Sequence, residues 1–232
     1  MTHRESQPVN RTDAQRHIEA IAHDAARFLS AHIARNVALG VGGCALLTGP
    51  TRAGKSLAGL RLADDLRAGG LAVTLALPAV AREDIVPRRL VSASGASAEA
   101  GSFGDTETIA SIFGSAATVI VDEVQFTPEL LWDALEDAVR RRAAHGGWSV
   151  LLGMLYASNR QLFPLTARLR AHADVVIGLT AVCQVCGRPT ALYSQRLLHG
   201  CPAPSSLPLL LGPTEAITYE PRCATCHVID GV

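Results

Sequence analysis

One lysine stands out among the residues that could do chemistry. The 232-residue sequence holds 21 lysine and arginine residues in total, and Lys55 is the only lysine. It lies in the glycine-rich stretch Gly49-Pro50-Thr51-Arg52-Ala53-Gly54-Lys55-Ser56. A compact ammonium group on a flexible stem reaches the β- and γ-phosphates of a nucleotide, whereas a guanidinium group is broader. We therefore expect this stretch to bind phosphates, with Ser56 as a ligand for Mg²⁺.

Two adjacent carboxylates follow an apolar run later in the chain. Asp122 and Glu123 come directly after Thr118-Val119-Ile120-Val121, a pattern typical of a buried strand. Ligands of open α/β sheets bind at the carboxyl ends of the strands, so we expect both acids beside the glycine-rich stretch. There Asp122 would support Mg²⁺. Glu123, which we expect to point to the other side of the strand, would act as a general base.

Two C-x₂-C pairs form a third candidate site. They are Cys183 with Cys186 and Cys223 with Cys226. Four thiolates at this spacing suit a tetrahedral metal ion, so the sequence predicts structural zinc. Two alternatives stay open, namely reactive or disulfide-linked pairs without a metal, and His227 in place of Cys226 as the fourth ligand. Cys44 and Cys201 have no evident partner.

Alternating apolar runs and helical patterns predict the elements that position these residues. Buried parallel strands are expected at residues 44–47, 71–75, 118–121, 149–152 and 175–177. A helix is expected directly after the glycine-rich stretch and ends at the glycines 69 and 70. Another helix is expected to begin at Thr127-Pro128-Glu129, to bury Leu130 and Leu131, and to end near residue 146.

A further amphipathic helix is expected near the N-terminus. Apolar residues recur at helical spacing from Ile18 to Ile33, with Thr12 and Asp13 available as caps. Its polar face mixes both charges, so we expect it to pack on the core or on a neighbouring subunit rather than on a membrane.

These patterns divide the chain into three parts. We expect an N-terminal extension over residues 1–40, with 1–11 loose, an α/β nucleotide-binding domain over 41–180, and a small zinc-binding domain over 181–232.

Composition bounds the function. Formal net charge is zero, and 48% of the residues are hydrophobic. A neutral chain has no bulk attraction for nucleic acid or anionic membranes, so we expect neither as a partner. Charged residues are scattered through the first twenty positions, and no apolar run is long enough to span a bilayer, so a cytoplasmic protein is expected.

Together these motifs resemble the zinc-containing thymidine kinases, over about residues 46–226. Residues 49–56 match that family's loop G-x-x-x-S/A-G-K-S/T, and Asp122-Glu123-Val124-Gln125-Phe126 matches its D-E-x-Q-F. Residues 179–187 match its L-T-A-V-C-x-x-C-G. The resemblance implies an α/β P-loop NTPase fold (RecA-like) with a parallel sheet and a small C-terminal zinc-binding lasso domain.

The resemblance also implies an activity, which is ATP- and Mg²⁺-dependent transfer of a γ-phosphoryl group to the 5′-hydroxyl of a deoxynucleoside, most of all thymidine. Residues 49–56 with Asp122 and Gln125 would hold ATP and metal, and Glu123 would accept the hydroxyl proton. Arg196 stands where the family has an arginine, and Tyr219 where a tyrosine lies in a loop that wraps the nucleoside. The nucleoside contacts implied are Phe126, Met154, Phe163, Thr180 and Tyr219. Zinc would anchor a lasso over about residues 193–219, and the protein would be a homo-oligomer, either dimer or tetramer.

Two segments depart from the family pattern. In the acceptor segment, Leu155 stands in place of an aspartate and Ser158 in place of a phenylalanine, so one aromatic wall is missing. The D-x-R after the second strand falls at residues 81–83 and lacks its acid. Three readings follow: a thymidine or related nucleoside kinase, a phosphotransferase with a different small acceptor, or a module that binds ATP and signals through its occupancy.

Overall fold

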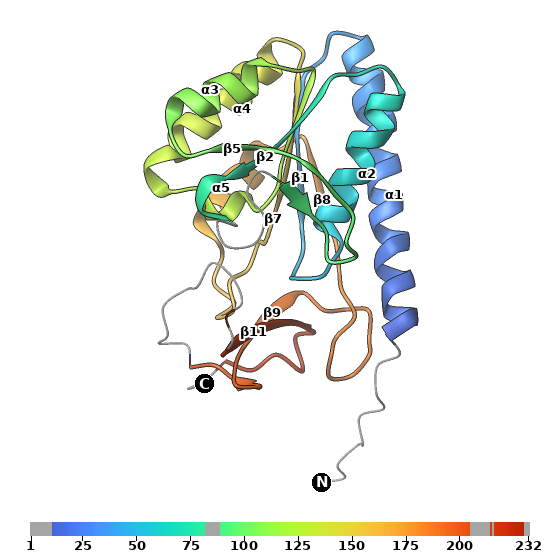
Figure 1. Ribbon diagram of the computed structural model, residues 1–232, viewed down its shortest axis with the longest axis vertical. Coiled ribbons are helices and arrows are strands. Elements are labelled where there is room, and N and C mark those ends of the chain that lie inside the picture. The colour runs from blue at the N-terminus through green and yellow to red at the C-terminus, as the bar shows by residue number, and fades with distance from the viewer. Residues whose placement is uncertain (1–10, 82–88, 205–213, 215, 230–232) are drawn as a thin grey trace.

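A six-stranded parallel sheet forms the centre of the molecule. The computed structural model describes residues 11–81, 89–204, 214 and 216–229 (Figure 1). The sheet contains β1 (Gly43–Thr48), β2 (Val73–Pro78), β5 (Gly101–Phe103), β6 (Thr118–Val121), β7 (Trp148–Gly153) and β8 (Val175–Gly178). Their order is β5-β2-β6-β7-β1-β8, and every neighbouring pair is parallel. The five predicted strands are confirmed, although β2 begins at Val73 rather than at Leu71. The short strand β5 was not predicted.

Helices cover both faces of this sheet (Figure 1). One face carries α1 (Arg11–Ala38) and α2 (Lys55–Ala68), and the other carries α3 (Thr106–Gly114), α4 (Trp132–Ala144) and α5 (Pro164–His172). Side chains of a strand alternate between faces, so each of the four inner strands contributes to two cores. In β1, Ala45 and Leu47 pack with α1 and α2, whereas Cys44 and Leu46 pack with α3, α4 and α5. Burial on both faces explains why these four strands consist mostly of apolar residues.

Helix α1 packs against the core, as predicted. Ala22, Ala26, Leu29 and Ile33 are fully buried in the cluster that also contains the apolar face of α2. The predicted caps are wrong, because the helix begins at Arg11 and therefore already contains Thr12 and Asp13. The predicted loose segment 1–11 lies outside the described residues except for Arg11.

The start of α4 also differs from the prediction. Two short 3₁₀ turns, η2 (Val124–Phe126) and η3 (Glu129–Leu131), come first, and the α-helix begins only at Trp132. The Thr127 hydroxyl donates to the carbonyl of Val124 at 2.9 Å, so it closes η2 instead of capping a helix. Leu130 lies on the 3₁₀ turn and is 82% exposed, whereas the prediction buried it.

Three further elements were not predicted as strands. These are β9 (Tyr193–Leu198), β10 (Cys201–Pro202) and β11 (Ile217–Arg222), which form an antiparallel sheet in the order β10-β9-β11. This small sheet lies beyond the carboxyl ends of the parallel strands (Figure 1). The two ends of the predicted lasso are therefore paired strands, and residues 205–213 and 215 between them lie outside the described part.

The connection from β2 to β5 contains the 3₁₀ turn η1 (Ala79–Ala81) and an antiparallel hairpin of β3 (Arg89–Val91) and β4 (Ser97–Glu99). Most of the divergent segment 81–83 lies outside the described residues. Among the described helices, none is long and apolar enough to cross a bilayer.

Candidate active site

The glycine-rich loop joins the carboxyl end of β1 to the start of α2, as predicted. Strand β1 ends at Thr48, and α2 begins at Lys55. Gly54 precedes the helix with φ +88°, a left-handed conformation that favours glycine. A Cβ atom at Gly54 would lie 3.0 Å from the Ile18 side chain of α1. Both the backbone and the close approach of α1 therefore require glycine here.

Lys55 is held inside this loop. Its side chain is buried, and its ammonium group donates to the carbonyls of Gly49 at 3.0 Å and Pro50 at 2.9 Å. The loop closes further through a bond from the Ala53 amide to the Pro50 carbonyl. The single lysine of the chain thus lies at the N-terminus of α2, where backbone amides and the helix dipole favour an anion.

Ser56 and Asp122 meet as predicted. The Ser56 hydroxyl donates to Oδ2 of Asp122 at 2.6 Å, and Oδ1 of the same carboxylate accepts the Glu123 amide at 2.9 Å. Asp122 has no exposed surface. A hydroxyl and a carboxylate oxygen side by side are ligands that suit Mg²⁺.

Glu123 has a different backbone from the one predicted. Strand β6 ends at Val121, so Glu123 does not alternate with Asp122 along a strand, and its φ of +54° is left-handed. Its carboxylate accepts from Nε2 of Gln125 at 2.6 Å. The other end of that amide, Oε1, accepts the Met154 amide at 3.1 Å. Gln125 therefore joins the carboxylate to the chain that follows β7.

That following chain, residues 153–163, is called the acceptor segment below. It folds back on itself through bonds from the Phe163 amide to the Leu155 carbonyl at 3.0 Å and from the Ala157 amide to the Gln161 carbonyl at 2.8 Å. Phe163 is buried, and its ring meets the ring of Phe126 edge to face, with centroids 6.1 Å apart. Three of the predicted nucleoside contacts, Phe126, Met154 and Phe163, are thus brought together.

Ser194 on β9 also reaches the glycine-rich loop, which sequence reasoning missed. Its hydroxyl accepts the Thr51 amide at 2.9 Å and lies 3.5 Å from the sulfur of Met154. A serine in a strand that was not predicted gave no signal in the sequence. Thr180, another predicted contact, follows Leu179, whose amide donates to the Thr48 carbonyl at 2.7 Å. Thr180 therefore lies directly beside the start of the loop.

Tyr219 is not in a loop, so that prediction is wrong. It lies in β11 and pairs with Arg196 of β9. Burial raises the pKa of Tyr219, and the charge of Arg196 opposes that rise. Arg196 is itself buried and donates to the Pro204 carbonyl at 3.0 Å. Pairing of the two strands fixes both side chains.

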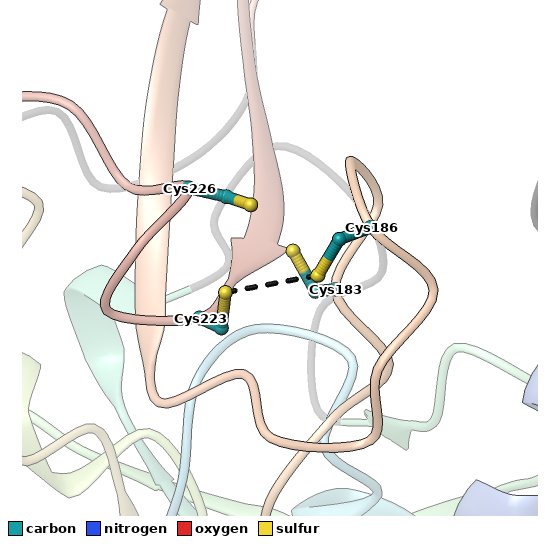
Figure 2. A group of neighbouring side chains, drawn as sticks. All are labelled: Cys183, Cys186, Cys223 and Cys226. Atoms are coloured by element: carbon teal, nitrogen blue, oxygen red, sulfur yellow. Dashed lines mark hydrogen bonds between the residues drawn. The ribbon is translucent and has the colours of Figure 1, made fainter. Parts of the chain in front are cut away.

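The four paired cysteines converge from two segments of the chain (Figure 2). The four sulfur atoms all lie within 4.8 Å of one another, and those of Cys186 and Cys223 are 3.8 Å apart. Zinc–sulfur bonds of about 2.3 Å in a tetrahedron separate the sulfurs by about 3.8 Å, so the cluster fits zinc. All four are free thiols.

His227 does not belong to this cluster, which favours Cys226 over the alternative of His227 as the fourth ligand. Its Nδ1 lies 3.3 Å from Nε of Arg160. Burial, together with the positive charges of Arg160 and Arg222, lowers the pKa of His227 to about 4. A neutral imidazole can accept the hydrogen bond from Arg160.

Comparison with known proteins agrees with these features. A family model described as thymidine kinase matches residues 42–227. Similar proteins include the thymidine kinases of Pyrobaculum aerophilum, 43% identical over 112 residues, and Thermococcus kodakarensis, 40% identical over 110 residues. That of Halobacterium salinarum is 34% identical over 122 residues.

These alignments cover only part of each protein. They span 48%, 47% and 53% of this chain and 56%, 52% and 60% of the respective relatives. The family model spans far more, from the residue before β1 to the residue after the last cysteine of the cluster. The chain belongs to the thymidine kinase family.

Proposed function

We propose that this chain transfers the γ-phosphoryl group of ATP to the 5′-hydroxyl of a deoxynucleoside, with thymidine as the preferred acceptor. The observation that carries the proposal is the contact between Ser56 and Asp122 at 2.6 Å, beside the buried Lys55 and one residue from Glu123. Membership of the thymidine kinase family and the names of the relatives support the same activity.

The nucleotide end of the site is proposed to be a P-loop. Residues 49–56 would bind the ATP phosphates through backbone amides, and Lys55 would leave its present carbonyl partners for the β- and γ-phosphates. Ser56 and Asp122 would hold Mg²⁺, and Gln125 would stay beside them. When bound, Mg²⁺ neutralises negative charge on the phosphates.

The acceptor end is proposed to lie between Glu123 and the acceptor segment. Glu123 would accept the proton of the 5′-hydroxyl, and its bond to Gln125 orients the carboxylate. Phe126, Met154 and Phe163 would contact the base, with Thr180 and Tyr219 as further contacts. Most of the rate would come from positioning and from charge stabilisation.

The proposal also includes a structural zinc ion, three domains and a homo-oligomer. The four cysteines would hold a structural zinc ion that fixes the small antiparallel sheet. The boundaries 1–40, 41–180 and 181–232 stay a prediction. Cys183 and Cys223 pack in the same apolar cluster as α1 and α2. A homo-oligomeric state is likewise a prediction from the resemblance.

One observation favours a second candidate, a related phosphotransferase with a different small acceptor. Leu155 and Ser158 leave the acceptor segment less polar and less aromatic than the family pattern. Loss of an aromatic wall removes roughly 1 kcal/mol of stacking from a bound base.

The test is an assay with γ-labelled ATP across the natural deoxynucleosides and an ATP-only control. Label transfer to thymidine above the others supports the proposal. Transfer only to another acceptor supports the second candidate. Label released as free phosphate at one slow rate in every tube contradicts both, and indicates a module that binds ATP.

A further inference from the structure

Arg160 lies at the tip of the acceptor segment in a conformation that arginine rarely adopts. Its φ is +62°, and its amide donates to the Ala157 carbonyl at 3.0 Å, which closes the tip. A left-handed non-glycine residue costs free energy, so surrounding contacts must hold it.

Those contacts come from the second cysteine pair. Nη2 of Arg160 donates to the carbonyl of Ala224 at 2.8 Å and to the carbonyl of His227 at 3.0 Å. Nε lies 3.3 Å from Nδ1 of His227. Ala224 lies between Cys223 and Cys226, so one guanidinium group joins the acceptor segment to the turn that carries two of the four thiols.

An aromatic ring lies against the same guanidinium group. Its central carbon lies 4.8 Å from the centroid of the Tyr193 ring. The Tyr193 ring is 5.2 Å from the ring of His227 and 5.3 Å from the ring of Tyr156, which belongs to the acceptor segment. Planar stacking and forked hydrogen bonding are properties of arginine that lysine does not share.

Both segments that Arg160 joins, the small sheet and the acceptor segment, also contact the proposed active site. Next to Tyr193, Ser194 accepts the Thr51 amide of the glycine-rich loop. At the base of the acceptor segment, Phe163 meets Phe126, and Met154 bonds to Gln125. The tip contact of Arg160 therefore fixes one end of a segment whose other end lines the proposed nucleoside site.

We propose that Arg160 is a positioning residue that docks the acceptor segment on the second cysteine pair and thereby sets the affinity for the nucleoside acceptor, but not for ATP. The inference rests on the proposed function. Metal binding by the four thiols would order the turn that contains the Ala224 carbonyl, to which Arg160 donates. We therefore expect the acceptor segment to be more ordered when the metal is bound.

The test compares the full chain with Arg160→Leu, Arg160→Lys and a control. Arg170→Leu on α5 is the control, because Arg170 is an exposed arginine close to the acceptor segment in sequence. We expect Arg160→Leu to raise the KM for the nucleoside about tenfold, the effect of losing one or two charge-assisted hydrogen bonds, with the KM for ATP and the zinc content unchanged. Arg160→Lys keeps the positive charge but loses the forked hydrogen bonding of the guanidinium group. Its KM for the nucleoside should lie between those of the wild type and Arg160→Leu.

Hydrogen–deuterium exchange supplies a readout that does not depend on activity. In Arg160→Leu the amides of residues 155–163 should exchange faster, while those of residues 46–58 stay unchanged. Removal of the metal by a chelator should speed exchange in residues 155–163 of the wild type. It should add little in Arg160→Leu, where the contact is already lost.

Three outcomes would overturn the inference. The first is unchanged exchange and unchanged nucleoside KM in Arg160→Leu. The second is an equal rise in the KM for ATP, which indicates a general structural defect. The third is an equal increase in the exchange of residues 155–163 when the chelator is added to the wild type and to Arg160→Leu. Exchange is measured without nucleoside, so it tests the docking contact independently of activity. A wild type that phosphorylates no nucleoside would contradict the proposed function, and the exchange experiment would still test the contact.

Discussion

Glu123 connects the two halves of the proposed reaction. Its backbone neighbour Asp122 contacts Ser56, and its side chain contacts Gln125, which in turn holds the start of the acceptor segment. Residues held in sparsely populated backbone conformations cluster at functional sites, and Glu123 has a φ of +54°. Because Glu123 lies in this left-handed turn beyond β6, strand alternation does not set the position of its carboxylate.

Replacing this carboxylate separates its two conceivable roles. We expect Glu123→Gln to lower kcat by roughly 10²-fold, as loss of a general base does, and to leave the KM for ATP within about twofold. Glu129→Gln, at an exposed acid on η3, is the matched control. A comparable loss of ATP affinity would instead assign Glu123 to the metal.

The lone lysine offers a second test at a single residue. Lys55→Ala and Lys55→Arg should both lower kcat/KM by at least roughly 10²-fold, since a guanidinium group does not fit where the buried ammonium lies between two loop carbonyls. Arg67→Lys on the exposed end of α2 should retain activity. Near-normal turnover of Lys55→Arg would refute the role given to the ammonium group.

At the scale of elements, we expect the small sheet to depend on the cysteine cluster, because the two cysteine pairs flank its paired strands. Strands β9 and β11 pair along their whole lengths, between the first and second cysteine pairs. Their sheet has only three strands, so a metal ion is the natural source of additional stability.

Metal analysis tests this dependence. We expect about one zinc ion per chain, lost in Cys223→Ser together with a lower melting temperature, and retained in Cys201→Ser. Cys201 is the matched control because it is an exposed thiol outside the cluster. A metal-free protein with a Cys183–Cys186 disulfide would contradict the zinc assignment.

Two alanines on helix α1 allow a test of its packing against the core. Ala26 is fully buried in the core cluster, whereas Ala31 on the same helix is exposed. Ala26→Leu should lower the free energy of unfolding by roughly 1–3 kcal/mol through overpacking, and Ala31→Leu should change it by less than about 0.5 kcal/mol. Denaturant unfolding of both variants decides, and equal effects would argue against a buried α1 face.

The sequence predicted strands correctly where a run of consecutive apolar residues marks a strand of the central sheet. Each of the five predicted parallel strands has apolar residues on both sides, and these strands were found. Strands β9 and β11 mix Ser194, Gln195 and Glu220 with apolar residues, and their pairing depends on contacts 19 or more residues apart in sequence, which local periodicity cannot report. The start of α4 was misread because a 3₁₀ turn and an α-helix share their first-turn residues.

At the scale of the whole molecule, three strand ends converge on one place. The glycine-rich loop follows β1, the two carboxylates follow β6, and the acceptor segment follows β7, which lies between β1 and β6 in the sheet. Parallel strands bring such ends to one edge, which is why sequence motifs alone predicted that the glycine-rich loop and Asp122 lie together. The contacts of Ser194 and Arg160 escaped prediction because they join segments that are far apart in the sequence.

The most direct measurement of the central claim is single-turnover transfer from γ-labelled ATP to thymidine, compared with 5′-deoxythymidine, which lacks the reacting hydroxyl. The proposed mechanism predicts that the label appears in thymidine 5′-phosphate, that the analogue receives none, and that Lys55→Ala abolishes the transfer. Release of the label as free phosphate at the same rate with thymidine, with the analogue and with ATP alone would contradict it.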